Sequence, residues 1–457
     1  MAGVAKIPYT QNWQSDLNSR LSDNCKPSKR NLRTTFSHRN ESSLPCFLYN
    51  TEIEESEKEP IYPRDHDHGD LEGEDTVEMV IWLRDRTGLH LELQGNGHQA
   101  KVSELFQKIQ ESRNLPENAH TIFSLWMVSP LLEFRLKDDH QPFEIAQLWD
   151  RFCLEYADSS MDDIARDEPV VMVQRNVFLS RKDEKLLWDT APEEVMSLLY
   201  HEAKYNIIRG RYLLSDSDYD NLAGIQALLE KGPFTRDLES YKDDLKNYYP
   251  HHLCKNKKLR GRKAVTAERL KEAHQLAFSN TGDMTKQQLC GQYLTICAKY
   301  PFYGGAFFDA VLQKPTGNIS SMVNRSLARG FPERDVTVTI NTEGICVIDD
   351  QEKEVLLTVP YEQLSWDYVN RREGSKMPTL YIQFLTKADE STRVLQIYSK
   401  QAPFMDALVD TCVRKKQDEQ SYDKSEDKNE TFCYGICNKL DRLCLKKYSL
   451  TGQSMDN

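Results

Sequence analysis

Short segments in which apolar and polar residues alternate follow one another between residues 303 and 416. In residues 336–340 (VTVTI), valine and isoleucine alternate with threonine, which predicts a strand with one buried and one solvent-facing side. Similar patterns predict further strands over residues 306–312, 345–348, 355–359, 364–368, 380–384 and 394–398. About seven strands in so short a stretch predict a small barrel.

One amphipathic helix follows these strands. Its apolar residues form a continuous stripe and are Phe404, Met405, Leu408, Val409, Cys412 and Val413. We expect this helix to close one end of the barrel. Between the second and third strands, residues 341–344 (NTEG) predict a hairpin turn with Gly344 at positive φ.

The patterned part of the chain begins at Val77, and residues 79–83 and 89–93 predict a pair of strands joined by a turn. The i, i+3, i+4, i+7 spacing of apolar residues over 102–109 predicts a helix. Further strands are expected over residues 122–128 and 131–136. Hairpin, helix and more strands in this order favour a ubiquitin-like β-grasp.

Helical periodicity replaces alternation over residues 190–300. Residues 190–193 (TAPE) predict a capping box at the start of the first helix. Gly232 and Pro233 should end the second helix. The apolar stripes between such signals predict a compact bundle of four or five helices. The complete chain is therefore expected to be an α+β multidomain protein.

Composition narrows the class of protein. The chain has 457 residues, eleven cysteines and a net charge of −12, with a mean hydropathy of −0.65. No apolar run approaches the roughly 18 residues that span a bilayer, and the start lacks a signal-peptide core, so we expect reduced thiols in a soluble protein. The negative charge argues against nucleic-acid binding. Residues 1–75, acidic from residue 51, and the polar tail 417–457 are expected to be disordered.

Catalytic motifs are missing from the sequence, so a non-enzyme without a cofactor is predicted. His201-Glu202 begins like a zinc-protease motif, but Tyr205 stands where the second histidine is needed. Residues 65–68 (DHDH), residues 251–254 (HHLC) and the tail cysteines Cys433, Cys437 and Cys444 contain metal-ligand types. None has the spacing and rigid surroundings of a preorganised site, so no metal is expected. Zinc binding or palmitoylation of the tail cysteines remains an alternative to free thiols.

The order β-grasp, helical bundle, capped barrel resembles a FERM module. Residues 302–308 (FYGGAFF) resemble the entry to its third lobe, and residues 359–366 (VPYEQLSW) resemble its middle strands. A closer similarity is to the FERM domain-containing protein 8 (Bili) family. It is carried by residues 125–133 (LWMVSPLLE), 140–142 (HQP), 167–169 (DEP) and 397–402 (IYSKQA).

The FERM resemblance implies a division of the chain. Lobe 1 would be ubiquitin-like and span residues 76–180. Lobe 2, a helical bundle like that of acyl-CoA-binding protein, would span residues 181–301. Lobe 3, a barrel of pleckstrin-homology or phosphotyrosine-binding type with its C-terminal helix, would span residues 302–416. Unlike in ezrin-type proteins, no long helical actin-binding extension is expected after Lys416.

The family resemblance also implies a function. Members are adaptors associated with the cytoplasmic tails of iRhom pseudoproteases, which keeps the iRhom–TACE sheddase complex at the cell surface. They are also linked to negative regulation of Wnt signalling at the tail of the co-receptor. A protein of this kind would be cytoplasmic and peripheral at the cytosolic face of the plasma membrane.

The most specific hypothesis for a functional site is a peptide-binding groove in the barrel. In phosphotyrosine-binding barrels a ligand strand adds to the fifth strand beside the C-terminal helix. Here the expected groove residues are Gln363, Leu364, Ser365, Trp366, Asp367 and Tyr368 on the strand, and Met405, Leu408, Val409 and Cys412 on the helix. The alternative is that all apolar helix residues are core. Because no arginine pair stands out in this strand, an unphosphorylated peptide is expected.

A basic cluster offers a second hypothesis, binding of anionic lipid headgroups. It comprises Lys255, Lys257, Lys258, Arg260, Arg262 and Lys263, with Arg269 and Lys271 following and Glu268 the one acid among them. Each such residue contributes about 1 kcal/mol near an anionic membrane surface. A nuclear import signal and a plain solvated loop are the other interpretations of this cluster.

Overall fold

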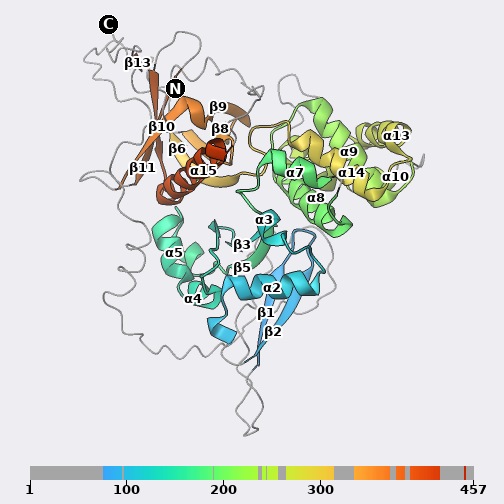
Figure 1. Cartoon of the computed structure of the whole chain (residues 1–457). Helices are drawn as coiled ribbons and strands as arrows, with labels where there is room; N and C mark the ends of the chain where they lie inside the picture. The colour runs from blue at the N-terminus through green and yellow to red at the C-terminus, as the bar shows by residue number, and fades with distance from the viewer. Residues whose placement is uncertain are drawn as a thin grey trace.

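A computed structural model of the chain describes residues 76–94, 97–188, 190–234, 239–242, 244–255, 264–312, 334–370, 377–385, 392–422 and 447–448. Three lobes are visible in Figure 1, each with its own set of elements. The leader 1–75, with its DHDH stretch, and the tail cysteines lie outside the described residues.

Lobe 1 is built on a five-stranded sheet of order β2-β1-β5-β3-β4. The strands are β1 (Thr76–Trp82), β2 (Gly88–Gln94), β3 (Phe123–Val128), β4 (Glu133–Arg135) and β5 (Val170–Arg175). Strand β5 runs parallel to β1 and antiparallel to β3. The accompanying helices are η2 (Gly97–Gln99), α2 (Val102–Ser112), α3 (Ala119–Ile122), α4 (Pro142–Gln147), α5 (Trp149–Tyr156) and α6 (Met161–Ile164). Central strand β5 and helices α4 to α6 were not predicted from the sequence.

Lobe 2 is helical. Its elements, after the connecting helix α7 (Arg181–Trp188), are α8 (Glu193–Ile208), α9 (Asp216–Lys231), α10 (Glu239–Lys242), α11 (Leu245–Tyr248), α12 (His251–Lys255), α13 (Ala267–Thr281) and α14 (Lys286–Cys297). Gly232 ends α9 with a φ of 74°, as predicted. The predicted capping box is wrong: Pro192 precedes α8 without a side-chain cap, and the Thr190 hydroxyl donates to the Leu186 carbonyl instead.

Lobe 3 holds an eight-stranded sheet whose main path is β10-β11-β12-β6-β7-β8-β9. The strands are β6 (Ala306–Leu312), β7 (Arg334–Ile340), β8 (Gly344–Asp349), β9 (Glu354–Pro360), β10 (Leu364–Val369), β11 (Thr379–Leu385), β12 (Thr392–Tyr398) and the short β13 (Lys447–Tyr448). Helix α15 (Ala402–Tyr422) lies across these strands (Figure 1). The predicted succession of strands closed by one helix is confirmed.

The hairpin between β7 and β8 forms where it was predicted, but for a different reason. The side chain of Asn341 accepts hydrogen bonds from the backbone N–H groups of Glu343 and Gly344. Gly344 is not among the glycines with positive φ. A Cβ atom at this position would instead collide with the carbonyl of Val359 on β9. Close approach of two strands therefore requires the glycine.

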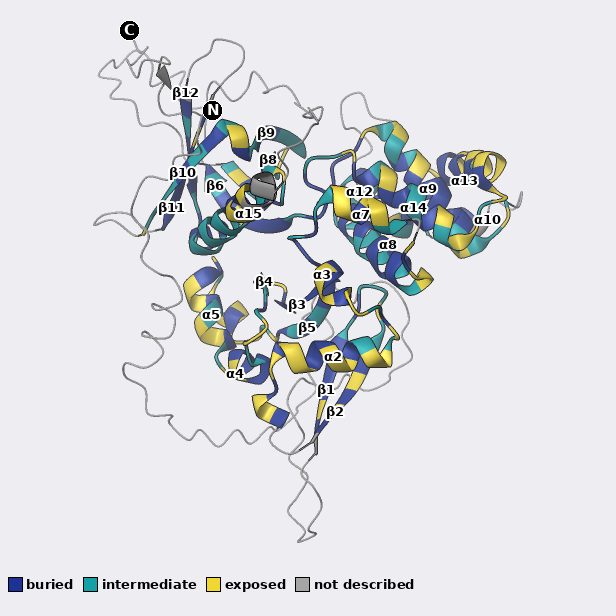
Figure 2. Ribbon diagram, in the orientation of Figure 1, coloured by how far each residue is buried: buried dark blue, intermediate teal, exposed yellow. Residues whose placement is uncertain are grey.

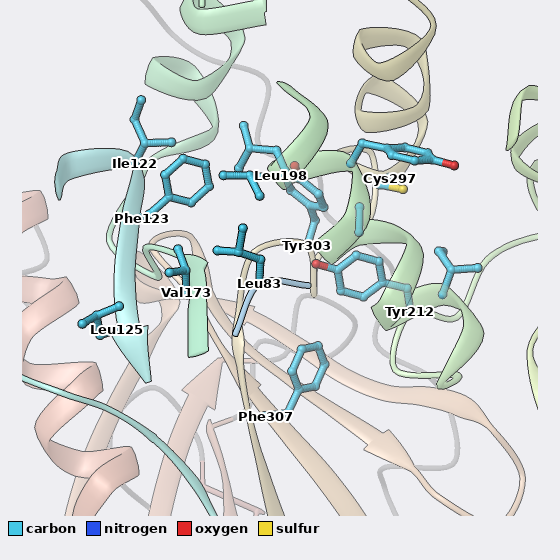
Figure 3. Close-up of a cluster of buried hydrophobic side chains, with 14 of the residues drawn as sticks. Leu83, Ile122, Phe123, Leu125, Val173, Leu198, Tyr212, Cys297, Tyr303 and Phe307 are labelled. Atoms are coloured by element: carbon cyan, nitrogen blue, oxygen red, sulfur yellow. The ribbon is translucent and has the colours of Figure 1, made fainter. Parts of the chain in front are cut away.

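Buried apolar side chains continue from one lobe into the next. Figure 2 shows helices of lobe 2 with one buried and one exposed face, as expected for a bundle. One cluster contains Leu83 and Phe123 from lobe 1, Leu198 and Tyr212 from lobe 2, and Phe307 from lobe 3 (Figure 3). The lobes therefore share a core, which fixes the orientation of the barrel relative to the other lobes.

Candidate peptide-binding site

The fifth strand of lobe 3, β10, lies at one end of the sheet. It pairs with β11 along its length, from Leu364 opposite Phe384 to Val369 opposite Thr379. Among the described strands none pairs with its other side. The edge therefore presents backbone N–H and C=O groups to an incoming strand. The sequence-based strand count, on which the position of the groove depended, agrees with the structure.

Side chains of β10 alternate as the pattern predicted. Leu364 and Trp366 are buried in the barrel core, whereas Ser365 and Asp367 are half-buried on the other face. Tyr368 is partly buried and packs against the barrel core. Gln363 precedes the strand in the short 3-10 helix η5 (Tyr361–Gln363) and is half-buried. The strand thus keeps a partly solvent-facing side along the open edge.

The helix side of the predicted groove is wrong for most of its residues. Met405, Val409 and Cys412 are buried in the barrel core, and burial raises the pKa of the Cys412 thiol to about 12. Leu408 is partly buried and packs against the same core. The 3.6-residue period places these side chains over the open end of the barrel, so the alternative that they are core holds for Met405, Val409 and Cys412.

Polar contacts also join α15 to the region of β10, in addition to the apolar side chains that both contribute to the barrel core. The indole N–H of Trp366 donates to Asp406 Oδ1 at 2.8 Å. Nearer the other end of the helix, Lys416 pairs with Glu362 of η5 at 2.7 Å. The helix therefore runs antiparallel to β10, with its later residues beside the start of the strand. Asp406 was missed because a search for an apolar groove ignores polar helix positions.

Lobe 1 covers another flank of α15. The ring of Phe404 lies 4.4 Å from that of Tyr156 and 5.7 Å from that of Phe134, measured between centroids. Lys400 donates to the carbonyl of Ala157, just after α5, at 2.7 Å. Further along, Lys415 lies 5.0 Å from the ring centroid of Phe178. Lobe 1 therefore covers a flank of α15 that differs from the one on which Asp406 contacts Trp366 of β10.

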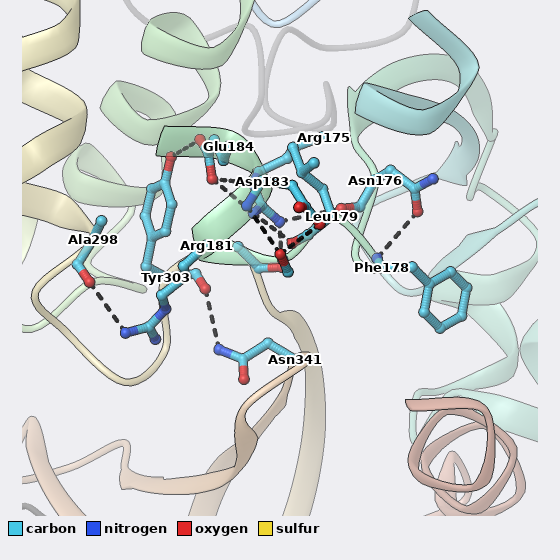
Figure 4. A network of polar contacts seen from close by, with 12 residues as sticks. Arg175, Asn176, Phe178, Leu179, Arg181, Asp183, Glu184, Ala298, Tyr303 and Asn341 are labelled. Atoms are coloured by element: carbon cyan, nitrogen blue, oxygen red, sulfur yellow. Dashed lines mark hydrogen bonds and ion pairs between the residues drawn. The ribbon is translucent and has the colours of Figure 1, made fainter. Parts of the chain in front are cut away.

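A buried ionic network holds the lobes together at their junction (Figure 4). The Arg175 guanidinium at the end of β5 pairs with Glu184 of α7 at 2.7 Å and donates to the carbonyls of Leu179 and Gly304. Glu184 also accepts a hydrogen bond from the Tyr303 hydroxyl. Burial alone would lower the pKa of Arg175, but the Glu184 carboxylate raises it above its ordinary value. Both charges are therefore paired and hydrogen-bonded, as buried ions require.

Gly304 is part of the same junction and begins the path into lobe 3. Its φ is 67°, and a Cβ atom there would collide with the Arg175 guanidinium. Beside it lies a cavity of about 10 Å³ lined by residues of all three lobes, among them Gln174, Asn206 and Phe307. A cavity of this size holds at most about one water molecule. It is too small to be a substrate site.

The His201-Glu202 pair, which begins like a zinc-protease motif, makes structural contacts within the fold. His201 contacts the Ser197 carbonyl of its own helix at 2.8 Å, and Glu202 contacts the backbone N–H of Arg175. Burial raises the pKa of Glu202, although Arg84 and Arg175 oppose this shift. No group of three or more metal-ligating side chains is assembled within the described residues. Among the described helices, none is both long and apolar enough to cross a bilayer.

Most of the basic cluster lies outside the described residues, namely Lys257, Lys258, Arg260, Arg262 and Lys263. Lys255 is the last residue of α12. Arg269, counted with the cluster, is buried in the bundle and pairs with Asp220 at 2.6 Å. It also lies 5.4 Å from the ring centroid of Tyr249. Arg269 therefore links α13 to α9 and is no longer counted among the residues that would bind a lipid headgroup.

The fold and its third lobe define a FERM module. The FERM central domain family matches residues 189–308, and the family described as KRIT1/FRMD8, FERM domain C-lobe, matches residues 334–408. A solved MyTH4-FERM domain of Dictyostelium discoideum myosin VII is similar over 75% of this chain and 61% of that chain, with a TM-score of 0.51 and 12% identity. The human myosin 7b MyTH4-FERM domain, solved with a harmonin-a PDZ3 domain, covers 74% of this chain and 60% of that chain, with a TM-score of 0.50 and 18% identity.

Curated relatives define the family more narrowly. FERM domain-containing protein 8 of Mus musculus is 34% identical over 367 residues, which cover 76% of this chain and 75% of the mouse protein. The Homo sapiens protein of the same name is 32% identical over 366 residues, with the same shares covered. The chain belongs to the FERM domain-containing protein 8 family. FERM proteins of this kind are generally non-enzymatic adaptors.

Proposed function

We propose that this protein is an adaptor that binds the cytoplasmic tail of a membrane protein by adding a strand of that tail to β10. The observation that supports the proposal is that β10 is the end strand of the sheet among the described strands, with α15 beside it. Backbone hydrogen bonds supply affinity in this mode of recognition, and side chains beside the edge supply specificity.

The proposed tail is unphosphorylated. Phosphotyrosine recognition uses basic side chains that can grip a phosphate. Of the bases described on this flank of α15, Arg414 pairs with Asp410 at 2.8 Å and Lys416 pairs with Glu362 at 2.7 Å. A phosphate would have to compete with these carboxylates for its partners.

Membership of the family supports particular partners for this site. We take an iRhom-type tail as the first candidate, with retention of an iRhom–TACE sheddase complex at the cell surface as the outcome. The tail of a Wnt co-receptor, with negative regulation of Wnt signalling, is the second candidate. Either partner would hold the protein at the cytosolic face of the plasma membrane.

The test measures binding of an iRhom cytoplasmic tail to the intact protein by isothermal titration. Along β10, successive backbone N–H groups point alternately toward β11 and toward the open edge. Ser365 and Tyr368 differ in this direction. One of the substitutions Ser365→Pro and Tyr368→Pro therefore removes an outward backbone donor, and the other removes a hydrogen bond to β11. The variant that keeps the native melting curve should lose tail binding. Ser365→Ala, which keeps the backbone donor, should bind as wild type does. Full binding by the folded proline variant would overturn the proposal.

A lipid-directed peripheral scaffold that acts through residues 255–263 is the alternative. The sequence favours it because these residues combine six bases with no acid. Flotation with vesicles of phosphatidylcholine and phosphatidylserine separates the two functions. Reversing the charges of Lys257, Lys258 and Arg260 should abolish flotation only under the lipid hypothesis, while the β10 variants should leave it unchanged.

A further inference from the structure

Strand β2 is the end strand of the lobe 1 sheet and lies on the side of this lobe that is remote from the barrel (Figure 1). It pairs with β1 along the full length of both strands, and no other strand of the described part of the chain pairs with it. Leu89, Leu91 and Leu93 are buried, whereas His90 and Glu92 are exposed. The outer side of β2 is therefore an edge to which a further strand can add.

The backbone of β2 shows which residues point to this edge. At the turn between the strands, the Leu83 N–H donates to the Thr87 carbonyl, so these residues form a hydrogen-bonded pair. Such pairs recur at every second residue of an antiparallel ladder, so the odd-numbered residues of β2 bond β1. His90 and Glu92 then direct their N–H and C=O groups outward. The Lys108 ammonium of α2 agrees with this direction, since it donates to the Glu92 carbonyl at 3.3 Å.

A second copy of the same strand fits this edge in one preferred register. Identical strands that pair about a two-fold axis form an antiparallel ladder, and its hydrogen bonds require that outward residues face each other. An axis at Leu91 sets His90 of each copy opposite Glu92 of the other. An axis at His90 would set two imidazoles face to face, and an axis at Glu92 would set two carboxylates face to face. Opposite charges across a strand pair stabilise it and like charges destabilise it, which favours the axis at Leu91.

The monomer contains an unfavourable contact that this pairing would relieve. The register of β1 and β2 places the exposed side chains of Glu78 and Glu92 directly opposite each other. Like charges in such a cross-strand pair are destabilising. Within one copy, His90 Nδ1 lies 2.7 Å from Glu78 Oε1. In the dimer, Nε2 of the same ring would donate to Glu92 of the second copy, so that each imidazole lies between two carboxylates.

We infer that the protein self-associates through β2, as a two-fold dimer in which the five-stranded lobe 1 sheets of two copies join into one continuous sheet. The Lys108 ammonium must then release the Glu92 carbonyl to an N–H of the second copy. One strand pair buries little area, so the dimer should be weak and the monomer should dominate at low micromolar concentration. The inference does not depend on the function proposed for β10, since the two edges belong to different lobes. The opposing hypothesis is that another segment of the same chain pairs with β2.

The test is sedimentation equilibrium of the intact protein from low to several hundred micromolar, in about 0.15 M salt to screen the repulsion between two copies of charge −12. We expect a shift from monomer to dimer with concentration. His90→Glu sets carboxylates opposite each other twice per dimer and should weaken association at least about tenfold. Adding Glu92→Lys to this variant should restore association to within about threefold of wild type. His120→Glu, the same charge change at an exposed position of α3, should have no effect.

A backbone variant tests the pairing itself. His90→Pro removes an outward N–H and no bond to β1, so it should keep the native melting curve and lose dimerisation. The charge exchange between positions 90 and 92 decides the matter even if the proline variant does not fold. A wild-type protein that stays monomeric up to several hundred micromolar would overturn the inference, and slow hydrogen exchange of the His90 and Glu92 amides in that monomer would assign the edge to the same chain. A dimer unaffected by His90→Glu would also overturn it, because the interface would then lie elsewhere.

Discussion

Buried polar residues in lobe 2 show how single side chains are constrained. His274 on α13 is buried, with Nδ1 2.9 Å from the Tyr241 hydroxyl and Nε2 2.9 Å from the Gly232 carbonyl. Since the carbonyl can only accept, Nε2 carries the proton and Nδ1 accepts from the tyrosine. Burial lowers the pKa of His274 below its ordinary value of 6.5, and Lys231 acts in the same direction. The neutral ring therefore links the end of α9 to α13.

This contact predicts a pH dependence of stability. Below about pH 6.5 the unfolded chain binds a proton at His274 more readily than the folded chain, so unfolding becomes easier as the pH falls. The slope is at most about 1.4 kcal/mol per pH unit, and it ends below the lowered native pKa. Urea unfolding of wild type and His274→Gln between pH 7.5 and 5 should show the advantage of wild type shrinking toward low pH.

The control for this titration is His90→Gln, since His90 is exposed and pairs with Glu78 on the surface of lobe 1. Its substitution should leave the fall in stability in place. A difference between wild type and His274→Gln that stays constant across the pH range would contradict the buried neutral ring.

At the scale of elements, local patterns predicted what depends on local sequence. Alternation gave the strands of lobe 3 in the right number up to β10, because each strand has one face on the barrel core. The groove side of α15 could not be predicted in the same way. A stripe of six apolar residues exceeds what the barrel buries, and the covering of Phe404 by lobe 1 depends on a contact about 250 residues away in the chain.

Burial of the α15 side chains in the barrel core changes how the site should be probed. Val409 is fully buried, so Val409→Asp places an unpaired carboxylate in the barrel core at a cost of several kcal/mol. We expect a lower melting temperature and increased proteolysis of lobe 3. Gln417→Asp is at an exposed position on the same helix. Its free energy of unfolding should lie within about 0.5 kcal/mol of that of wild type. A native melting curve for Val409→Asp would mean that the helix side chains are accessible, as first expected.

For the whole molecule, the positions of the lobes depend on contacts that no local pattern predicts. Arg113 of lobe 1 donates to Glu194 of lobe 2 at 2.9 Å, and Arg211 of lobe 2 pairs with Glu133 of lobe 1 at 2.8 Å. Arg175 contacts Gly304, which is 129 residues further along the chain. Long sequence separations of this kind join charged residues whose spacing carries no periodic signal. The junction could therefore be found only from the structure.

The junction should be the most sensitive point of the fold. Arg175→Met removes the cation and leaves Glu184 buried with the Tyr303 hydroxyl as a remaining donor. An uncompensated buried charge costs about 3–5 kcal/mol. We expect a lower melting temperature and new proteolytic cleavage between lobes. Arg166→Met, which removes an exposed partner of Asp163, should cost less than about 1 kcal/mol. Equal melting temperatures for Arg175→Met and Arg166→Met would contradict this prediction. The buried pair would then not fix the position of lobe 3 relative to the other lobes.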